Sequence, residues 1–117
     1  MADTKHVVLP GTLNLLILKT LASLGELHGY GIARRIEQVS DDLLELNQGT
    51  VYPALLKLEQ MGWIRTRWST SENNRRAKYY RLTAKGRRQL DVETTKWDKL
   101  SGAIARILRP AEQEGKS

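Results

Sequence analysis

The chain has no cysteine and only two histidines, and these shortages exclude several kinds of chemistry. Without cysteine it can form no disulfide, no thiolate nucleophile and no zinc site with sulfur ligands. His6 and His28 lie far apart, and no cluster of His, Asp and Glu has the spacing of a metal site. No acid, base and nucleophile occur together at a meaningful spacing either. We therefore expect no metal, no cofactor and no enzymatic activity.

Long apolar runs are also missing. The apolar stretch from Leu13 to Leu18 is far shorter than the roughly 20 residues that cross a bilayer, and no long apolar core precedes Pro10. We therefore expect a cytoplasmic protein that does not enter a membrane. With 117 residues, the chain has room for one ordinary domain and one modest hydrophobic core.

What the chain does have is an excess of positive charge. Its formal net charge of +6 predicts a surface that attracts polyanions, and nucleic acid is the first partner to consider. Many soluble proteins are basic, however, so the net charge alone does not identify the partner. The positions of the basic residues along the chain must decide between the two interpretations.

A first helix is predicted from Pro10 to Leu24, because apolar residues recur at helical spacing and Gly25 supplies a stop. The other side of this helix carries further apolar residues, namely Leu15, Leu18 and Ala22. A helix that is apolar nearly all round is usually covered from two directions. One of the two covers is expected to be another element or another chain.

Two more helices are predicted, the second over residues 30–39 and the third beginning between Asn47 and Thr50. Either of these two residues could be the N-cap of the third helix. Pro53 favours the later start, because a proline is tolerated in the first turn of a helix. The predicted apolar stripe of the third helix consists of Val51, Ala54, Leu55, Leu58 and Met61.

The next segment is predicted to be a β-hairpin. Residues 63–68 and 77–82 are rich in aromatic and β-branched residues that roughly alternate with polar ones, and residues 69–76 between them suit a turn. Asn73 or Asn74 can take the left-handed backbone angle that such a tip needs. Against the single acid Glu72, the hairpin carries the basic residues Arg65, Arg67, Arg75, Arg76, Lys78 and Arg81.

Thr83 is the predicted N-cap of a last helix that runs to Arg109 and ends before Pro110. The whole pattern predicts an α+β fold, in which three helices and a two-stranded β-wing form a winged helix-turn-helix and a long C-terminal dimerisation helix follows. We expect an N-terminal arm at residues 1–9, a winged-helix DNA-binding domain at 10–83, the dimerisation helix at 84–109 and a disordered tail at 110–117.

The outer face of the third helix has side chains of the kind that a recognition helix needs. Asn47 or Gln48 can pair with an adenine, and Thr50 can bond a phosphate or a base edge. Lys57 can neutralise a phosphate. The alternative is an ordinary amphipathic helix whose polar face simply meets water, and the helix alone does not decide between them.

The basic hairpin favours DNA. Arg75 and Arg76, with Lys78 close behind them, can reach backbone phosphates or a narrow minor groove beside the helix. Protection of an edge strand by charge is the alternative, and it accounts for some of these residues but not for their nearly uniform sign. Helix and hairpin together therefore predict binding to double-stranded DNA.

Several motifs now combine: Gly11-Thr12-Leu13, His28-Gly29-Tyr30-Gly31-Ile32, Thr50-Val51-Tyr52-Pro53-Ala54-Leu55, Gly62-Trp63-Ile64 and Arg76-Ala77-Lys78-Tyr79-Tyr80-Arg81-Leu82-Thr83. With them the chain resembles the PadR-like transcriptional regulators, in the subgroup with a single C-terminal helix. The resemblance implies a dimeric repressor that binds a two-fold, pseudo-palindromic operator and releases it when an effector binds. It also implies that Tyr52 approaches DNA and that Arg76 and Lys78 belong to the wing. In one departure, Asn73-Asn74 stands where many members have a glycine at the wing turn.

The last helix carries an apolar seam that consists of Leu90, Trp97, Leu100, Ile104 and Ile107. A seam of this kind needs a partner, and we expect the first helix of a second copy, with Leu15 and Leu18, to cover it. Glu93 interrupts the seam and Gly102 lowers helix propensity, so a freestanding coiled coil is not expected. The alternative is that the helix folds back on its own domain.

Trp97 has two interpretations. Near a dimer axis its ring could stack on a planar apolar or cationic small-molecule effector, whereas ordinary interface packing, for which aromatic residues are well suited, is the simpler interpretation. Trp63 and Trp68 are expected to be hairpin and core residues.

The resulting hypothesis is a sequence-specific regulator that represses a nearby operon by occlusion. Each protomer of a homodimer would insert its third helix into a major groove, with half-sites near one helical turn, roughly 34–36 Å, apart. The rival hypothesis is a winged-helix interaction module whose basic face binds an acidic partner protein.

Overall fold

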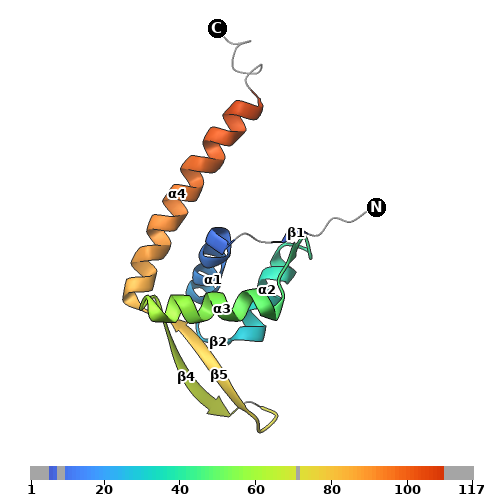
Figure 1. Ribbon diagram of the computed structural model, residues 1–117, viewed down its shortest axis with the longest axis vertical. Coiled ribbons are helices and arrows are strands. Elements are labelled where there is room, and N and C mark those ends of the chain that lie inside the picture. The colour runs from blue at the N-terminus through green and yellow to red at the C-terminus, as the bar shows by residue number, and fades with distance from the viewer. Residues whose placement is uncertain (1–5, 8–9, 71, 110–117) are drawn as a thin grey trace.

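Four helices and five strands follow one another in a computed structural model that describes residues 6–7, 10–70 and 72–109. Their order is β1 (His6–Val7), α1 (Pro10–Leu24), β2 (Leu27–His28), α2 (Gly29–Val39), β3 (Leu44–Glu45), α3 (Gln48–Gln60), β4 (Ile64–Thr70), β5 (Arg76–Leu82) and α4 (Ala84–Leu108). In Figure 1, α1, α2 and α3 lie together, the β4–β5 hairpin projects from one end, and α4 runs away in the other direction. The predicted α+β fold, three helices and a wing followed by a long helix, is confirmed.

The ends of α1 and α2 follow from local chemistry. After α1, Gly25 adopts a φ of 82° and its N–H donates to the carbonyl of Leu21 at 2.9 Å, a conformation that favours glycine because it has no Cβ. Four residues later α2 begins, with His28 as its N-cap. The Nδ1 atom of His28 accepts the N–H of Gly31 at 2.9 Å and so satisfies one free donor of the first turn. The α1–α2 connection is therefore short and fixed.

The start of α3 differs from the later start that the sequence favoured. Asn47 is the N-cap, and its Oδ1 accepts the N–H of Thr50 at 3.0 Å, so Thr50 already lies inside the helix. Pro53 consequently sits beyond the first turn, where it removes one backbone hydrogen bond. The helix tolerates this loss because its other face is anchored in the core. Met61, expected in the apolar stripe, is exposed at the C-cap instead.

The hairpin belongs to a three-stranded antiparallel sheet with the order β2-β5-β4. Thr66 lies opposite Tyr80, and Trp68 lies opposite Lys78, so these four side chains share one face of the sheet. The sequence predicted β4 and β5 but not β2, nor the parallel pair of β1 and β3, because two-residue strands carry no measurable period. At the tip Asn74 has a φ of 59°, as expected for one of the two asparagines.

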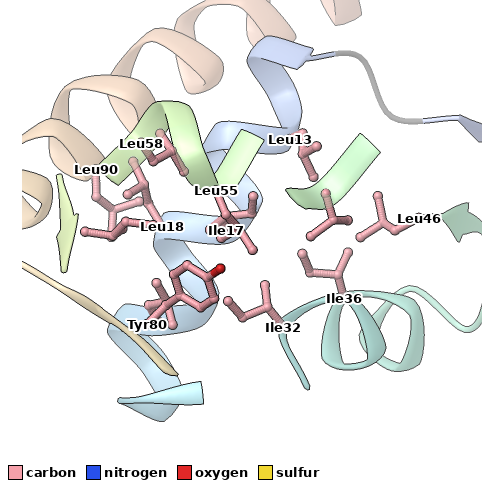
Figure 2. Close-up of a cluster of buried hydrophobic side chains, with 13 residues drawn as sticks. Leu13, Ile17, Leu18, Ile32, Ile36, Leu46, Leu55, Leu58, Tyr80 and Leu90 are labelled. Atoms are coloured by element: carbon pink, nitrogen blue, oxygen red, sulfur yellow. The ribbon is translucent and has the colours of Figure 1, made fainter. Parts of the chain in front are cut away.

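One hydrophobic core joins the helices to the sheet (Figure 2). Its buried side chains are Leu13, Ile17, Leu18, Leu21, Ile32, Ile36, Leu46, Val51, Leu55, Leu58, Ile64, Tyr80 and Leu90. Each fully buried aliphatic side chain of this kind contributes about 1.5–3 kcal/mol to the free energy of unfolding before the entropy cost is counted. Because α3 and β5 share this core through Tyr80, the base of the wing has a fixed place beside α3.

The position of α4 corrects two expectations about a dimer interface. Leu18 is 0% and Leu90 6% exposed, so both are buried within their own chain instead of facing a partner. At the base of α4, a Cβ added to Gly86 would lie 1.9 Å from the carbonyl oxygen of Trp63, which means that the two backbones touch. Figure 1 shows the far end of α4 projecting away from α1, α2 and α3.

The distal half of α4 is rich in exposed apolar residues, namely Trp97, Leu100, Ile104, Ile107 and Leu108, and Val92 in its first half is exposed as well. The helix ends at Leu108, and the predicted stop at Pro110 and the predicted tail lie outside the described residues, as does most of the predicted arm at 1–9. None of the helices in the described ranges is long and apolar enough to span a bilayer.

Candidate nucleic-acid interface

A cleft of about 920 Å³ lies between α3, the start of α2 and the inner face of the wing. It is lined by His28, Gly29, Tyr30, Tyr52, Leu56, Trp68, Asn73, Arg75, Arg76, Ala77, Lys78 and Tyr80. The lining therefore combines aromatic rings with three basic side chains, and we call it the cleft below.

The spacing of residues along α3 explains which of them face the cleft. Tyr52, Leu56 and Glu59 are spaced by four and three residues, so they form one stripe beside the core stripe of Val51, Leu55 and Leu58. The ring of Tyr52 packs over Gly29, where an added Cβ would lie 2.7 Å from the ring. A glycine at this position thus lets the start of α2 approach the side of α3.

Arg76 is held at the cleft by an aromatic neighbour. Its guanidinium carbon lies 5.2 Å from the centre of the Trp68 ring, a distance at which a cation and an aromatic face attract each other. Both side chains are exposed. This arrangement presents the charge of Arg76 to solvent in one preferred direction, as a phosphate contact requires.

Lys78, in contrast, is turned toward α3. Its Nζ lies 3.6 Å from Oε1 of Glu59 and 5.7 Å from the centre of the Tyr80 ring. The other carboxylate oxygen of Glu59, Oε2, accepts a hydrogen bond from the Thr66 hydroxyl at 2.9 Å. Burial raises the pKa of the Tyr80 hydroxyl, and the nearby Tyr52 and Glu59 raise it further. The charge of Lys78 is therefore largely balanced within the domain.

The first turn of α3 carries the remaining predicted base contacts. Oδ1 of Asn47 accepts both the N–H and the hydroxyl of Thr50, at 3.0 and 3.1 Å. Because that oxygen is used by the cap, pairing of Asn47 with a base would compete with the start of the helix. Gln48 and Lys57 are exposed on α3, but neither lines the cleft.

Sequence reasoning missed two aromatic residues at this surface. Tyr30 is 61% exposed, and Trp68, which lies in the hairpin as expected but not in the core, is 57% exposed. Both line the cleft. The signal for Trp68 was present in the alternation of β4, which places it on the same face as Thr66, but the sequence does not say how far the core extends along a strand.

The outer face of the wing is also basic, but it is a separate surface. Arg67 donates from Nε and Nη2 to the two carboxylate oxygens of Glu26, both at 2.7 Å, and Arg65 lies directly opposite Arg81. The hydrogen bond from Arg67 lowers the pKa of the Glu26 carboxyl, and the Glu26 carboxylate raises the pKa of Arg67. Only part of the wing's positive charge therefore faces the cleft.

The structure also brings together parts of α1 and α4. A shallow hollow of about 220 Å³ is lined by Gly11, Thr12, Leu15, Glu93, Lys96, Trp97 and Leu100. Three of the residues predicted for a dimer interface, Leu15, Trp97 and Leu100, meet here. Within the described ranges, no three His, Asp or Glu side chains are grouped as a metal ion would require.

Comparisons with known proteins agree with this geometry. The family model of the transcriptional regulator PadR-like family matches residues 17–92. A transcriptional regulator from Clostridium thermocellum has a similar structure, with a TM-score of 0.77 and 27% identity over 85% of this chain and 95% of that one. A PadR family transcription regulator from Clostridium difficile is 28% identical, with a TM-score of 0.71 over 82% of this chain and 97% of that one.

A curated relative adds a different context. An uncharacterized 37.1 kDa protein in transposon TN4556 of Streptomyces fradiae is 37% identical over 98 residues, which are 84% of this chain and 26% of that protein. The chain thus spans about a quarter of that relative's length. Regulators of the matched family bind DNA and are not enzymes. With the family model covering well over half of its residues, the chain belongs to the PadR-like family of transcriptional regulators.

Proposed function

We propose that the chain is a dimeric repressor that binds a two-fold operator, with α3 in the major groove and the wing on the adjacent backbone. The observation that carries this proposal is the cleft, in which the exposed side of α3 and the basic inner face of the wing lie next to each other. A duplex presents a groove and a phosphate backbone side by side, and these two elements match them.

The contacts divide into two kinds. Gln48, exposed in the first turn of α3, and Tyr52 would meet base edges, while Asn47 and Thr50 mainly preserve the helix start. Arg75 and Arg76 would meet phosphates or the minor groove from the wing, and Lys57 would meet the backbone beside α3. Base contacts from α3 would give sequence specificity, and wing contacts would give affinity.

The dimer is supported by the exposed apolar half of α4. Trp97, Leu100, Ile104 and Ile107 are exposed on one seam, and Leu15 of α1 lies beside its lower end. We propose that the seam packs against α1 and α4 of a second copy, so that residues 84–109 form the dimerisation helix and residues 10–83 the DNA-binding domain. Occupation of an operator by such a dimer would block transcription of the neighbouring genes.

Release by an effector forms part of the proposal and depends on Trp97. A planar apolar or cationic molecule would stack on its ring in the hollow between α1 and α4. Titration of such molecules should quench tryptophan fluorescence in a saturable way, and the quenching should disappear in Trp97→Ala. Quenching that persists in this variant would place the ligand near Trp63 or Trp68 instead.

The experiment that tests operator binding uses the purified full chain and duplexes tiled over the DNA upstream of its own gene. One duplex should bind tightly at low salt, and footprinting should show two protected half-sites about one helical turn apart, roughly 34–36 Å. Failure to bind any upstream duplex at low salt, or a single unpaired footprint, would contradict the proposal.

A second candidate function rests on the outer face of the wing. Arg65 and Arg81 oppose each other across two strands, and Glu26, which lines the same hollow, already binds Arg67 with both carboxylate oxygens. An acidic partner protein would supply further carboxylates for Arg65 and Arg81. A partner that binds there should be lost on Arg65→Gln and Arg81→Gln, while binding to the operator remains.

A further inference from the structure

We propose that Glu59 is the residue that positions the wing relative to α3, and that Lys78 serves this link and is not a phosphate contact. The contacts of Glu59 with the wing exist in the free protein. Only their expected effect on operator affinity rests on the proposed function. Lys78 thus has a role different from the one that its place in a basic hairpin suggests.

The carboxylate of Glu59 contacts both strands of the wing, β4 and β5. Oε2 of Glu59 accepts the hydroxyl proton of Thr66 from β4, and Oε1 faces the ammonium of Lys78 from β5. In the register of the hairpin, Thr66 lies opposite Tyr80, two residues from Lys78 on the same face. A single side chain of α3 therefore holds two neighbouring points on different strands.

The place of Glu59 on α3 makes this link relevant to recognition. Glu59 ends the stripe that begins with Tyr52 and continues through Leu56, and both of these residues line the cleft. Below the link, Ile64 anchors the base of the wing in the core, and above it β4 continues through Thr70 toward the tip. Glu59 is thus placed where a small change of the strand angle would be amplified at the tip.

The surroundings of Lys78 favour the inward position of its ammonium. The Tyr80 ring lies 5.7 Å away, the side chain of Lys78 is two-thirds buried, and that of Glu59 is buried to the same degree. An ammonium that is balanced by a carboxylate in this way displaces few counterions from DNA, because it brings little net charge to the backbone. Arg76, exposed over Trp68, has the opposite character.

These roles predict different salt dependences for the two residues. Arg76→Gln should weaken operator binding and lower the slope of log affinity against log salt by about one unit. Lys78→Gln should weaken binding by about two- to fivefold, as expected for a partly exposed ion pair, with the slope unchanged. A slope that falls by about one unit in Lys78→Gln would make Lys78 a phosphate contact and overturn the proposal.

A charge exchange separates positioning from simple loss of stability. Glu59→Lys and Lys78→Glu each create a pair of like charges and should weaken operator binding by about tenfold or more. The double variant, with the charges exchanged, should return to within about threefold of the unchanged protein at equal thermal stability. Weakening in the double variant that equals the product of the two single effects would show that the residues are not coupled.

The link can also be tested without DNA, which keeps its failure distinct from failure of the proposed function. The chain has no cysteine, so Lys57→Cys and Glu72→Cys give one spin label on α3 and one at the wing tip. With labelled chains diluted in unlabelled protein, electron paramagnetic resonance should give a narrow distance distribution that broadens in Glu59→Gln and in Thr66→Val. An unchanged distribution in both variants would overturn the proposal.

Discussion

Two parts of the molecule project from the core, the wing and the distal half of α4, and they differ in the chemistry that they expose. The inner face of the wing presents Arg76 over the ring of Trp68, whereas the seam of α4 presents Leu100, Ile104 and Ile107. Cations with aromatic rings suit a polyanion, and an exposed apolar seam suits another apolar surface. One chain of this size thus exposes two separate surfaces whose chemistry suits different partners.

The largest expected effect is on the stability of the fold, at the base of α4. This is where α4 is attached to the domain and turned away from the wing. In Gly86→Ala the new methyl group would meet the carbonyl of Trp63 at 1.9 Å, so the helix must shift from its place on the domain. We expect a loss of about 2–3 kcal/mol in the free energy of unfolding, measured by chemical denaturation.

Gly102 in the same helix provides the matched control. A Cβ added there would meet only Arg106 Nη1, at 3.6 Å, so Gly102→Ala should be neutral or stabilise the protein by up to about 1 kcal/mol. Similar losses in the two variants would contradict the close approach of α4 to Trp63.

The second prediction breaks the apolar seam of α4 and leaves the wing intact. Ile104→Glu places a charge where the proposed dimer excludes water, and it should convert the dimer to monomers and weaken operator binding by at least about thirtyfold. Sedimentation velocity and DNA titration measure the two effects.

Thr95→Glu is the control for that change, since Thr95 lies nine residues, or two and a half turns, before Ile104 on the opposite side of the helix. It adds the same charge and should remain dimeric. If both variants dissociate, net charge decides the assembly; if neither does, the seam is not the interface.

The smallest expected effect is on the outer side of the wing, where Glu26 meets Arg67. The hydrogen bond from Arg67 holds the pKa of the Glu26 carboxyl below its ordinary value. A lowered pKa stabilises the fold at pH values above the ordinary carboxyl pKa, and this contribution is lost as the pH falls through the lowered, folded-state pKa.

Glu26→Gln removes the charge but keeps an acceptor for Arg67. Its melting temperature should therefore be slightly lower than that of the unchanged protein at pH 6–7, and the difference should shrink as the pH falls through the lowered pKa of Glu26. A difference that persists undiminished at low pH would exclude titration of Glu26 as its cause. Because Arg67 is exposed, the effect at any pH is small.

The sequence was sufficient for the long elements and insufficient for the short ones. Helices of several turns and strands of seven residues carry enough periodicity to be placed within a few residues, and Gly25 and Thr83 act as the expected stop and cap. A two-residue strand such as β2 has no period at all. The start of α3 was misplaced because the rule for Pro53 and the cap at Asn47 pointed to different residues, and the cap decided.

The sequence predicted which kinds of residue form the candidate site, but not the direction in which their side chains point. Sequence identifies Lys78 and Arg76 equally as basic residues of a hairpin, although one bonds to Glu59 and the other stacks on Trp68. It also placed Leu18 on an outer face of α1, because an apolar residue looks the same whether its own core or a partner covers it. Distinguishing these cases requires the packing of the whole chain.

The central claim is that the inner face of the wing, beside α3, is the surface that binds DNA. Its most direct test compares Arg76→Gln on the inner face with Arg81→Gln on the outer face, by fluorescence anisotropy of an operator duplex over a series of salt concentrations. The predicted result is a salt slope lowered by about one unit in Arg76→Gln and unchanged in Arg81→Gln. An unchanged slope in Arg76→Gln together with a lowered one in Arg81→Gln would contradict the account.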